Sequence, residues 1–156
     1  MYYFMLIAAV IALDQFVKSV VTTYLASGVL PQGSITVIPG VFEITYVCNT
    51  GAAFSIFQGQ RFFLMLTSMI VIASLLVFVF LRRRKEHAML IFAASLIAGG
   101  GAGNLIDRIR FGAVVDFLAF WSFPVFNVAD IAVCTGCGLA ILHFVLLEYK
   151  SRKSAT

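Results

Sequence analysis

Four long apolar stretches constrain this chain of 156 residues more than any other feature. They run over about residues 3–26, 62–81, 88–106 and 125–147, and a helix needs roughly 20 apolar residues to cross a bilayer. Hydrophobic residues make up 62% of the chain and charged residues only 12%. This balance excludes a disordered chain and, despite the net charge of +4, a DNA-binding module. We expect one integral membrane domain over residues 1–156, an all-α bundle of four transmembrane helices.

Basic residues in short loops predict the orientation of the bundle, because Lys and Arg are concentrated in cytoplasmic loops. Seven of the eleven basic residues follow the second and fourth spans: Arg82, Arg83, Arg84, Lys85, Lys150, Arg152 and Lys153. Both termini are therefore expected in the cytoplasm, with residues 27–61 and 107–124 outside. Asp14 and Lys18 lie inside the first span, which argues against a cleaved signal peptide.

The outward segment 28–60 carries the pattern of a small extracytoplasmic β-sheet. Residues 35–38 and 41–47 are rich in β-branched and aromatic side chains, and the Pro39-Gly40 turn signal separates them. The segment is too long for a simple connection. We expect a sheet at the outer membrane surface, facing lipid or a lipidic ligand; a plain structured cap is the alternative.

The aspartates are the main functional signal, because an ionisable side chain within a span is unfavourable unless it is paired or functional. All four lie within or beside the outward half of the predicted bundle: Asp14, Asp107, Asp116 and Asp130. Asp14 and Lys18 are spaced i, i+4 and are predicted to form an ion pair, which could also border a polar cavity. Asp107 and Arg108 are predicted to form an interfacial charge pair.

Two of these carboxylates are expected to meet at the outer interface. Asp116 follows the third span in a loop, and Asp130 lies with Asn127 on the inward face of the fourth helix, which Pro124 is expected to open. Two carboxylates held close together cannot both ionise readily, so one keeps a proton near neutral pH. The pair is thus predicted to activate water as in aspartic proteases. The alternative is that Asp130 only caps the helix or pairs with Arg108.

Other chemistry has weaker support. His87 and His143 are expected far from the aspartates, so neither a metal site nor a Ser-His-Asp triad is predicted. Cys134 and Cys137 have redox spacing but lie within a span, where we expect them to pack between helices. No metal and no cofactor is predicted.

Five motifs, in order along nearly the whole chain, resemble the lipoprotein signal peptidases (signal peptidase II), a family of bacterial intramembrane aspartic peptidases. They are residues 14–18 (DQFVK), 49–54 (NTGAAF), 100–108 (GGAGNLIDR), 112–117 (GAVVDF) and 123–130 (FPVFNVAD). The resemblance implies that Asp116 and Asp130 are the catalytic pair. It also implies a set of residues that shape and support the site: Asp14, Lys18, Asn49, Gly51, Ala52, Asn104, Asp107, Arg108, Asn127 and Ala129.

The same resemblance implies a substrate and a cellular setting. The family cleaves prolipoproteins just before a lipobox Cys that carries a diacylglyceryl group, and so releases the signal peptide. We expect an outer β-cradle, with residues 28–60 and 109–122 as candidates for a mobile segment over the site. The expected location is the bacterial cytoplasmic membrane, with the active site at its outer face. Membrane lipids and globomycin-type cyclic peptide inhibitors are expected partners; nucleic acid is not, and the enzyme is expected to be a monomer.

Two other functional classes stay open on the residues alone. A small proton-coupled carrier would also place Asp and Lys in the membrane, but it should carry acids at mid-depth and some half-symmetry. A non-catalytic assembly factor would use the aspartates only to hold its helices together. The sequence also departs from many family members: the connection from Asp116 to Asp130 is short, Ile131 follows Asp130, and a basic N-terminal flank is missing.

Overall fold

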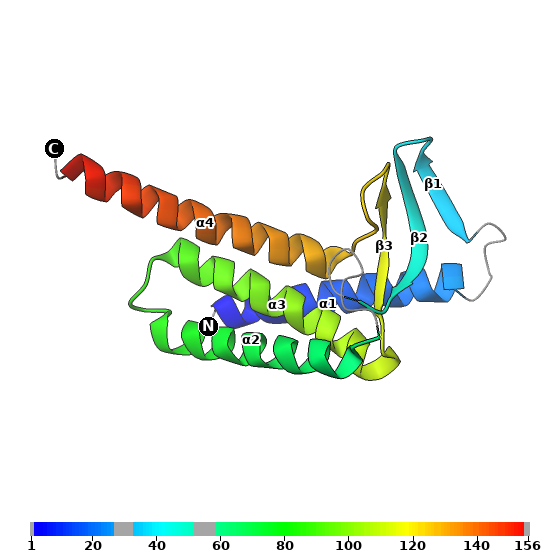
Figure 1. The fold of residues 1–156 in the computed structure, drawn as a ribbon, viewed down its shortest axis with the longest axis horizontal. Coiled ribbons are helices and arrows are strands. Elements are labelled where there is room, and N and C mark those ends of the chain that lie inside the picture. The colour runs from blue at the N-terminus through cyan, green and yellow to red at the C-terminus, as the bar shows by residue number, and fades with distance from the viewer. Residues whose placement is uncertain (1, 27–32, 52–58, 155–156) are drawn as a thin grey trace.

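The computed structural model describes residues 2–26, 33–51 and 59–154. Its helices are α1 (Tyr2–Val21), extended by the π-helical turn η1 (Thr22–Ala26), α2 (Arg61–Arg82), α3 (Ala88–Phe111) and α4 (Val128–Ser154). Each of these four α-helices is long and apolar enough to cross a membrane. Strands β1 (Ser34–Ile38), β2 (Phe42–Asn49) and β3 (Val114–Phe120) form an antiparallel sheet at one end of the bundle (Figure 1). The predicted fold class, four apolar helices with a small sheet, is confirmed.

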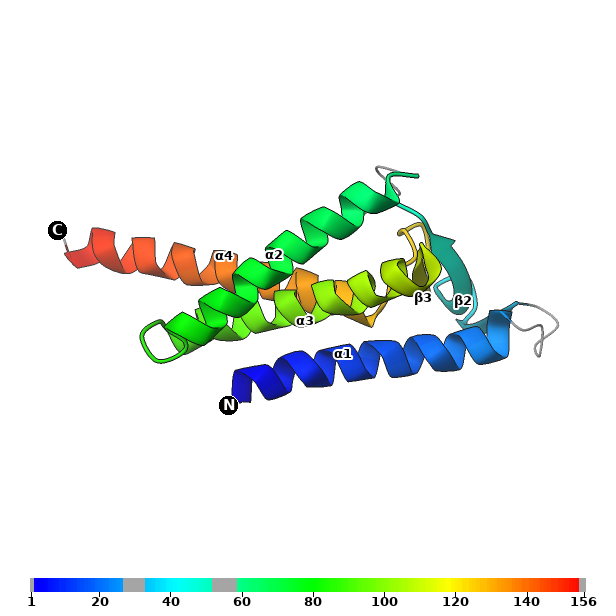
Figure 2. The same ribbon diagram turned by 90° about the horizontal axis from the view of Figure 1, so that it is seen from below.

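Helix α3 is the central helix, and it packs against α1, α2 and α4. Figure 2 shows it between α1 and α2. Small residues allow this position, because helices in lipid associate by close packing of their backbones. A Cβ at Gly103 would lie 2.6 Å from the Oδ2 atom of Asp14, and a Cβ at Gly100 would overlap the carbonyl oxygen of Ala129. The backbone of α3 therefore approaches both a polar side chain of α1 and the first turn of α4.

The sheet has the strand order β1-β2-β3. The predicted hairpin over residues 35–47 is present as β1 and β2, but the expectation that Asp116 lies in a loop is wrong. Residues 114–120 pair with β2, and Asp116 lies opposite Val47. The segment is almost continuously apolar, so it has no alternating pattern that would mark it as a strand, and the partner strand β2 decides its conformation.

The start of α4 also differs from expectation. Helix α4 begins at Val128, so Pro124 does not open it. The preceding residues instead fold back along β3. The N–H of Phe126 donates to the carbonyl oxygen of Leu118 at 3.1 Å, and the N–H of Leu118 donates to that of Phe126 at 2.8 Å. This pairing brings the beginning of α4 beside the strand that carries Asp116.

Apolar contacts attach the sheet to the bundle. Phe117 of β3 is 2% exposed and packs with Val21 and Leu25 at the end of α1. Asp116 is the neighbouring residue on the strand, so its side chain leaves the opposite face. The sheet is thus fixed on α1 through one face of β3, and the side chain of the preceding residue, Asp116, lies on the other face.

Candidate active site

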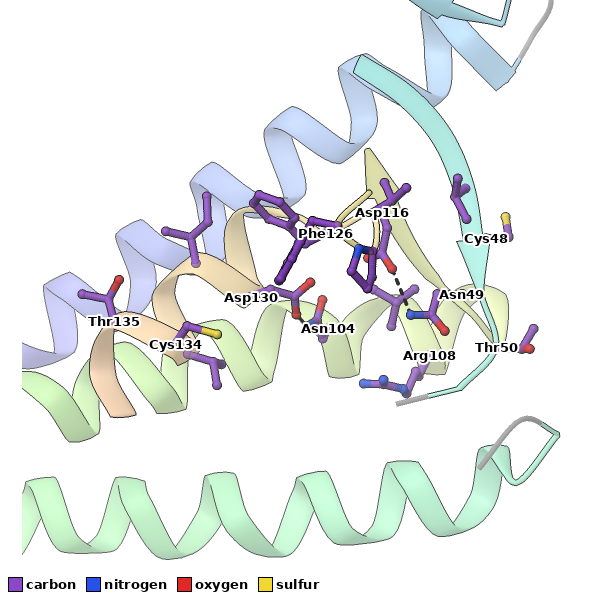
Figure 3. A pocket seen from close by; sticks show the side chains of 17 residues that line it. Cys48, Asn49, Thr50, Asn104, Arg108, Asp116, Phe126, Asp130, Cys134 and Thr135 are labelled. Atoms are coloured by element: carbon purple, nitrogen blue, oxygen red, sulfur yellow. Dashed lines mark hydrogen bonds between the residues drawn. The ribbon is translucent and has the colours of Figure 1, made fainter. Parts of the chain in front are cut away.

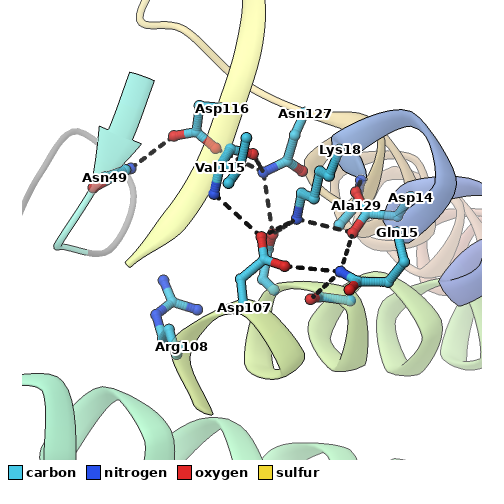
Figure 4. Close-up of polar contacts among 12 residues, drawn as sticks. Asp14, Gln15, Lys18, Asn49, Asp107, Arg108, Val115, Asp116, Asn127 and Ala129 are labelled. Atoms are coloured by element: carbon cyan, nitrogen blue, oxygen red, sulfur yellow. Dashed lines mark hydrogen bonds and ion pairs between the residues drawn. The ribbon is translucent and has the colours of Figure 1, made fainter. Parts of the chain in front are cut away.

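A buried ammonium group joins α1 to α3. Lys18 is 3% exposed, and its Nζ lies 2.8 Å from Asp14 Oδ2, 2.8 Å from Asp107 Oδ2 and 2.9 Å from Asn104 Oδ1. Three N–H donors therefore meet three acceptors (Figure 4). The predicted pair of Asp14 with Lys18 is present. The predicted pair of Asp107 with Arg108 is wrong, because adjacent residues on a helix do not face each other, and Asp107 turns to Lys18.

Both carboxylates of this cluster also accept backbone hydrogen bonds. Asp14 Oδ1 accepts from the N–H of Ala129 at 2.9 Å, in the first turn of α4. Asp107 Oδ2 accepts from the N–H of Val115 at 3.1 Å, near the start of β3. The two N–H groups belong to the residues directly before the two candidate catalytic aspartates. The cluster therefore holds both backbone segments that carry these aspartates.

Asn127 contacts both candidate catalytic carboxylates. Its Nδ2 donates to Asp116 Oδ1 at 2.7 Å, and its backbone N–H donates to Asp130 Oδ2 at 3.2 Å. In return, the N–H of Asp130 donates to Asn127 Oδ1 at 2.9 Å. These reciprocal bonds cap the start of α4, as in a capping box. Asn127 thus precedes the helix, so the expectation that it lies on the inward face of the helix is wrong. Asparagine is favoured in this capping position.

Asp116 is 3% exposed and is held by two amide groups. Besides Asn127, Asn49 of β2 donates from Nδ2 to Asp116 Oδ2 at 2.9 Å (Figure 3). Burial raises the pKa of Asp116 to about 6; the Asn49 bond opposes this rise, the charge of Asp130 adds to it, and the Asn127 bond opposes it. Asp116 is therefore a carboxyl group that can hold or release a proton near neutral pH.

Asn104 of α3 connects the ammonium cluster to Asp130. Its Oδ1 accepts from Lys18 at 2.9 Å and from Asn127 Nδ2 at 3.1 Å, while its Nδ2 donates to Asp130 Oδ1 at 2.8 Å. An ammonium group can only donate, so Lys18 fixes which end of the Asn104 amide faces it. The NH2 group is then directed at Asp130.

Both candidate catalytic aspartates line one pocket of about 730 Å³ (Figure 3). Most of the other lining side chains are apolar, and many come from the connection between β3 and α4 and from the start of α4: Phe123, Pro124, Val125, Phe126, Ile131 and Val133. Cys134 also lines the pocket, one helical turn after Asp130, and Cys137 is exposed. The expectation that these cysteines pack between helices is therefore wrong.

Arg108 ties the end of β2 to α3. Its Nη2 donates to the carbonyl oxygen of Gly51 at 3.0 Å, and the N–H of Gly51 donates to Asn49 Oδ1 at 2.9 Å. Within the described ranges, no carboxylate lies within ion-pair distance of Arg108, so the alternative pair with Asp130 is absent. Ala52, the remaining residue of the predicted set, lies outside the described residues.

Two polar residues at the site were not predicted. Gln15 donates from Nε2 to Asp107 Oδ1 at 2.8 Å and to the carbonyl oxygen of Gly103 at 3.2 Å. Its place inside an apolar span was a usable signal. Arg61, the first residue of α2, donates to the carbonyl oxygens of Arg108 and Ile109. No sequence pattern indicates a partner that is a backbone carbonyl.

The histidines lie outside this site, as expected, although they contact each other. The ring centroids of His87 and His143 are 5.1 Å apart, between the beginning of α3 and the second half of α4. Among the residues that the structure describes, no group of three or more His, Cys, Asp or Glu could hold a metal ion.

Comparison with known proteins identifies the family. The family model described as signal peptidase (SPase) II matches residues 6–146. The chain belongs to the signal peptidase II family. It is 40% identical over 144 residues to the lipoprotein signal peptidase of Symbiobacterium thermophilum, covering 90% of this chain and 91% of that relative. For the lipoprotein signal peptidase of Brevibacillus brevis the identity is 41% over 155 residues, covering 97% and 100%.

The fold agrees with this membership. A solved bacterial membrane enzyme structure at 2.3 Å resolution superimposes with a TM-score of 0.81 and 32% sequence identity, covering 97% of this chain and 91% of that chain. As a signal peptidase II, the chain is a multi-pass membrane protease of the aspartic type. This membership assigns the chain to the hydrolases, and not to the two other functional classes, a proton-coupled carrier or a non-catalytic assembly factor.

Proposed function

We propose that Asp116 and Asp130 are the catalytic pair with which this signal peptidase II removes signal peptides from prolipoproteins. The contact of Asn127 with both carboxylates carries the proposal, since it brings two acids from separate elements to one asparagine. Both acids also line the same pocket. Two carboxylates that share a site are the arrangement that lets one act as general base while the other acts as general acid.

We assign the base role to Asp130 and the acid role to Asp116. Asp130 accepts from the N–H of Asn127 and from the Asn104 amide at the N-terminal end of α4, where negative charge is favourable. Asp116 is buried within the sheet, and its raised pKa of about 6 favours the protonated form. The raised pKa of Asp116 therefore favours this residue as the member of the pair that carries the proton.

The reaction then follows general acid–base catalysis. Asp130 takes a proton from a water molecule, whose oxygen attacks the scissile carbonyl carbon, while Asp116 donates its proton to the carbonyl oxygen. As the tetrahedral intermediate collapses, the C–N bond breaks and the proton held by Asp130 passes to the leaving amine. Asp116 takes back a proton from a hydroxyl group of the intermediate as the C=O bond forms again, so both carboxyl groups return to their starting states. Asn49 and Asn127 keep the Asp116 carboxyl group in place through their amide hydrogen bonds. This scheme needs no metal and no cofactor.

The pocket supports a lipid-bearing substrate. Its polar groups surround the aspartates, while Phe123, Val125 and Phe126 provide an apolar wall on the side of the β3–α4 connection. A peptide whose Cys carries a diacylglyceryl group could place its scissile bond at the carboxylates and its acyl chains on apolar surface. We therefore propose cleavage directly before the lipid-modified Cys, and inhibition by globomycin-type cyclic peptides, as the family resemblance implies.

The placement of charges supports a bacterial cytoplasmic membrane protein with its active site at the outer face. The basic run Arg82–Lys85 joins α2 to α3 at the end of the bundle away from the sheet, and both termini lie toward that end in Figure 1. The excess of Lys and Arg marks this end as cytoplasmic. Membrane lipids then surround the exposed apolar faces of the helices, and we propose that the enzyme acts as a monomer.

The experiment compares two synthetic lipobox peptides, one with a diacylglyceryl Cys and one without lipid, as substrates of the purified protein. We expect cleavage of the lipidated peptide alone, before the Cys. Asp116→Asn and Asp130→Asn should each lower kcat by roughly 10²–10⁴-fold, while Glu43→Gln, a matched change in β2, should retain activity. Full activity in either Asp variant would refute the catalytic pair, and equal cleavage of both peptides would refute the substrate.

A further inference from the structure

The connection between α2 and α3 carries a concentration of positive charge that the proposed reaction does not use. Arg82, Arg83, Arg84 and Lys85 follow one another where α2 ends. Figures 1 and 2 place this connection at the end of the bundle opposite the sheet. It therefore lies far along the spans from the pocket that holds the aspartates, at the end of a helix that is long and apolar enough to cross a membrane.

Most of this charge has no neutralising partner. Arg82 Nη1 lies 3.4 Å from Glu86 Oε1, so one basic residue is paired. In the described part of the chain, no carboxylate lies within 4.0 Å of the side chains of Arg83, Arg84 or Lys85. The connection thus presents an excess of three positive charges over a short length of chain.

Apolar surface lies directly beside these cations. Phe80 and Leu81, in the last turn of α2, are 58% and 62% exposed. Together with Arg83, Arg84 and Lys85 they line a hollow of about 310 Å³. The guanidinium carbon of Arg83 lies 4.6 Å from the centre of the Phe80 ring. Charged and apolar walls therefore meet in one surface hollow at the end of a membrane span.

We propose that this hollow binds an anionic phospholipid, with its phosphate between Arg84 and Lys85 and an acyl chain along Phe80 and Leu81. The chemistry of the walls selects this ligand. A free anion would gain nothing from the exposed apolar side chains, and a lipid without net charge would leave the cations unneutralised. Basic clusters directly beside a span attract anionic headgroups in this way.

A second basic cluster at the same end of the bundle gives the matched control. Arg152 and Lys153, near the end of α4, are also exposed, but Arg152 Nη2 lies 2.7 Å from Glu148 Oε1, and neither residue lines the hollow. Neutralising this pair removes the same charge from the same side of the membrane. If the positive charge served only to orient the spans, the two pairs of basic residues would be equivalent.

The test measures phosphatidylglycerol bound to the full-length protein in detergent micelles, by native mass spectrometry over a lipid titration. We expect Arg84→Gln with Lys85→Gln to weaken binding roughly 30-fold, and Arg152→Gln with Lys153→Gln to leave it within about twofold of the parent. Thermal unfolding of each variant checks that the protein remains folded. Phosphatidylcholine and inorganic phosphate serve as competing ligands, and both should compete poorly.

Three outcomes would overturn the proposal. Equal weakening by both double variants would show that charge alone, without the hollow, attracts the lipid. Phosphatidylcholine binding as tightly as phosphatidylglycerol would remove the role of the cations. Inorganic phosphate binding as tightly as the lipid would make the site an anion site, without a role for Phe80 and Leu81.

Discussion

The carboxylate of Asp107 accepts a hydrogen bond at 3.1 Å from the backbone N–H of Val115. Val115 directly precedes Asp116 on β3, and Lys18 binds the same Oδ2 atom of Asp107 at 2.8 Å. A charged side chain from α1 therefore acts, through one carboxylate of α3, on the strand that carries a proposed catalytic residue.

Asp14 makes the equivalent connection to the other proposed catalytic residue. Its Oδ1 accepts from the N–H of Ala129, which precedes Asp130, while its Oδ2 lies 2.8 Å from the Nζ of Lys18. One ammonium group thus pairs with two carboxylates, and each carboxylate holds the backbone of one member of the catalytic pair. The relative position of β3 and α4 depends on this buried arrangement.

Lys18→Met should therefore destabilise the protein and reduce its activity together. The substitution leaves the carboxylates of Asp14 and Asp107 buried without their cation, and loss of one partner from a buried ion pair costs about 3–5 kcal/mol. Thermal unfolding in detergent would measure the change, with the exposed residue Lys150→Met as the control. An unchanged unfolding temperature for Lys18→Met would contradict this account.

Two substitutions at Asp107 should separate its charge from its role as an acceptor. Asp107→Asn keeps one oxygen that can accept from Val115, whereas Asp107→Leu keeps none and leaves that buried N–H unpaired. We expect Asp107→Leu to be less stable than Asp107→Asn by about 1–3 kcal/mol and to have the lower kcat. Equal stability and activity of the two variants would show that the bond to Val115 does not matter. Peptide cleavage and unfolding would be measured on the same preparations.

Gly103 should not tolerate even a methyl group. A Cβ at this position would lie 2.6 Å from Asp14 Oδ2, and overpacking of a close interface typically costs about 1–3 kcal/mol. Gly103→Ala should therefore lower the unfolding temperature, whereas Gly138→Ala in α4, where a Cβ would meet no atom within 4 Å, should not. If both variants unfold at the same temperature, α3 does not depend on this close approach.

The sequence predicts the features that the membrane makes conspicuous. The four spans stand out because a helix in lipid must be apolar along its whole length. Asp14 and Lys18 stand out for the complementary reason, since a charge within a span needs a partner. Asp116 and Asp130 follow from the same argument together with the family motifs.

The remaining contacts depend on tertiary structure. The pairing of β3 with β2 and the return of Phe126 along Leu118 are backbone hydrogen bonds between segments distant in sequence, which no local pattern encodes. The sequence suggests the adjacent Arg108 as the partner of Asp107, but adjacent residues on a helix diverge, and the actual partner lies on α1. Helical spacing could have excluded the first partner, but only the packing of α1 on α3 identifies Lys18.

Activity should fall as the pH rises above about 6. Burial raises the pKa of Asp116 from its ordinary value of 3.8 to about 6, and the proposed acid must be protonated, so kcat/KM should decline through this range. The same shift makes the Asp116 contribution to stability complete below about pH 4 and lost as the pH rises through about 6. A pH profile of cleavage and of unfolding would measure both effects.

Asn49→Ala should shift the decline of kcat/KM to higher pH, and it should also lower kcat. The Asn49 amide donates to Asp116 and opposes the rise in its pKa, so its removal favours the protonated carboxyl group. The control is Thr36→Ala, on an exposed part of the same sheet, which should leave the profile unchanged. If the decline of kcat/KM occurs at the same pH in Asn49→Ala, the group that titrates is not Asp116.

Arg61→Ala should weaken the contact between the start of α2 and the last turn of α3. Arg61 donates from Nε to the carbonyl oxygen of Arg108 at 3.1 Å and from Nη2 to that of Ile109 at 3.0 Å. These carbonyls belong to the last turn of α3, where a cation is favourable. Each lost bond costs about 0.5–1.5 kcal/mol.

The substitution of Arg61 should also affect the candidate active site. The side chain of Arg108 donates to the carbonyl oxygen of Gly51, and the N–H of Gly51 donates to Asn49. We expect a lower unfolding temperature and a lower kcat for Arg61→Ala. Arg61→Lys should recover only part of each, since an ammonium group lacks the planar fork that reaches two carbonyls. Arg110→Ala is the control, because its guanidinium lies over the Phe111 ring on the same helix end. Full recovery by lysine would show that the positive charge, and not the pair of hydrogen bonds, stabilises the contact between α2 and α3.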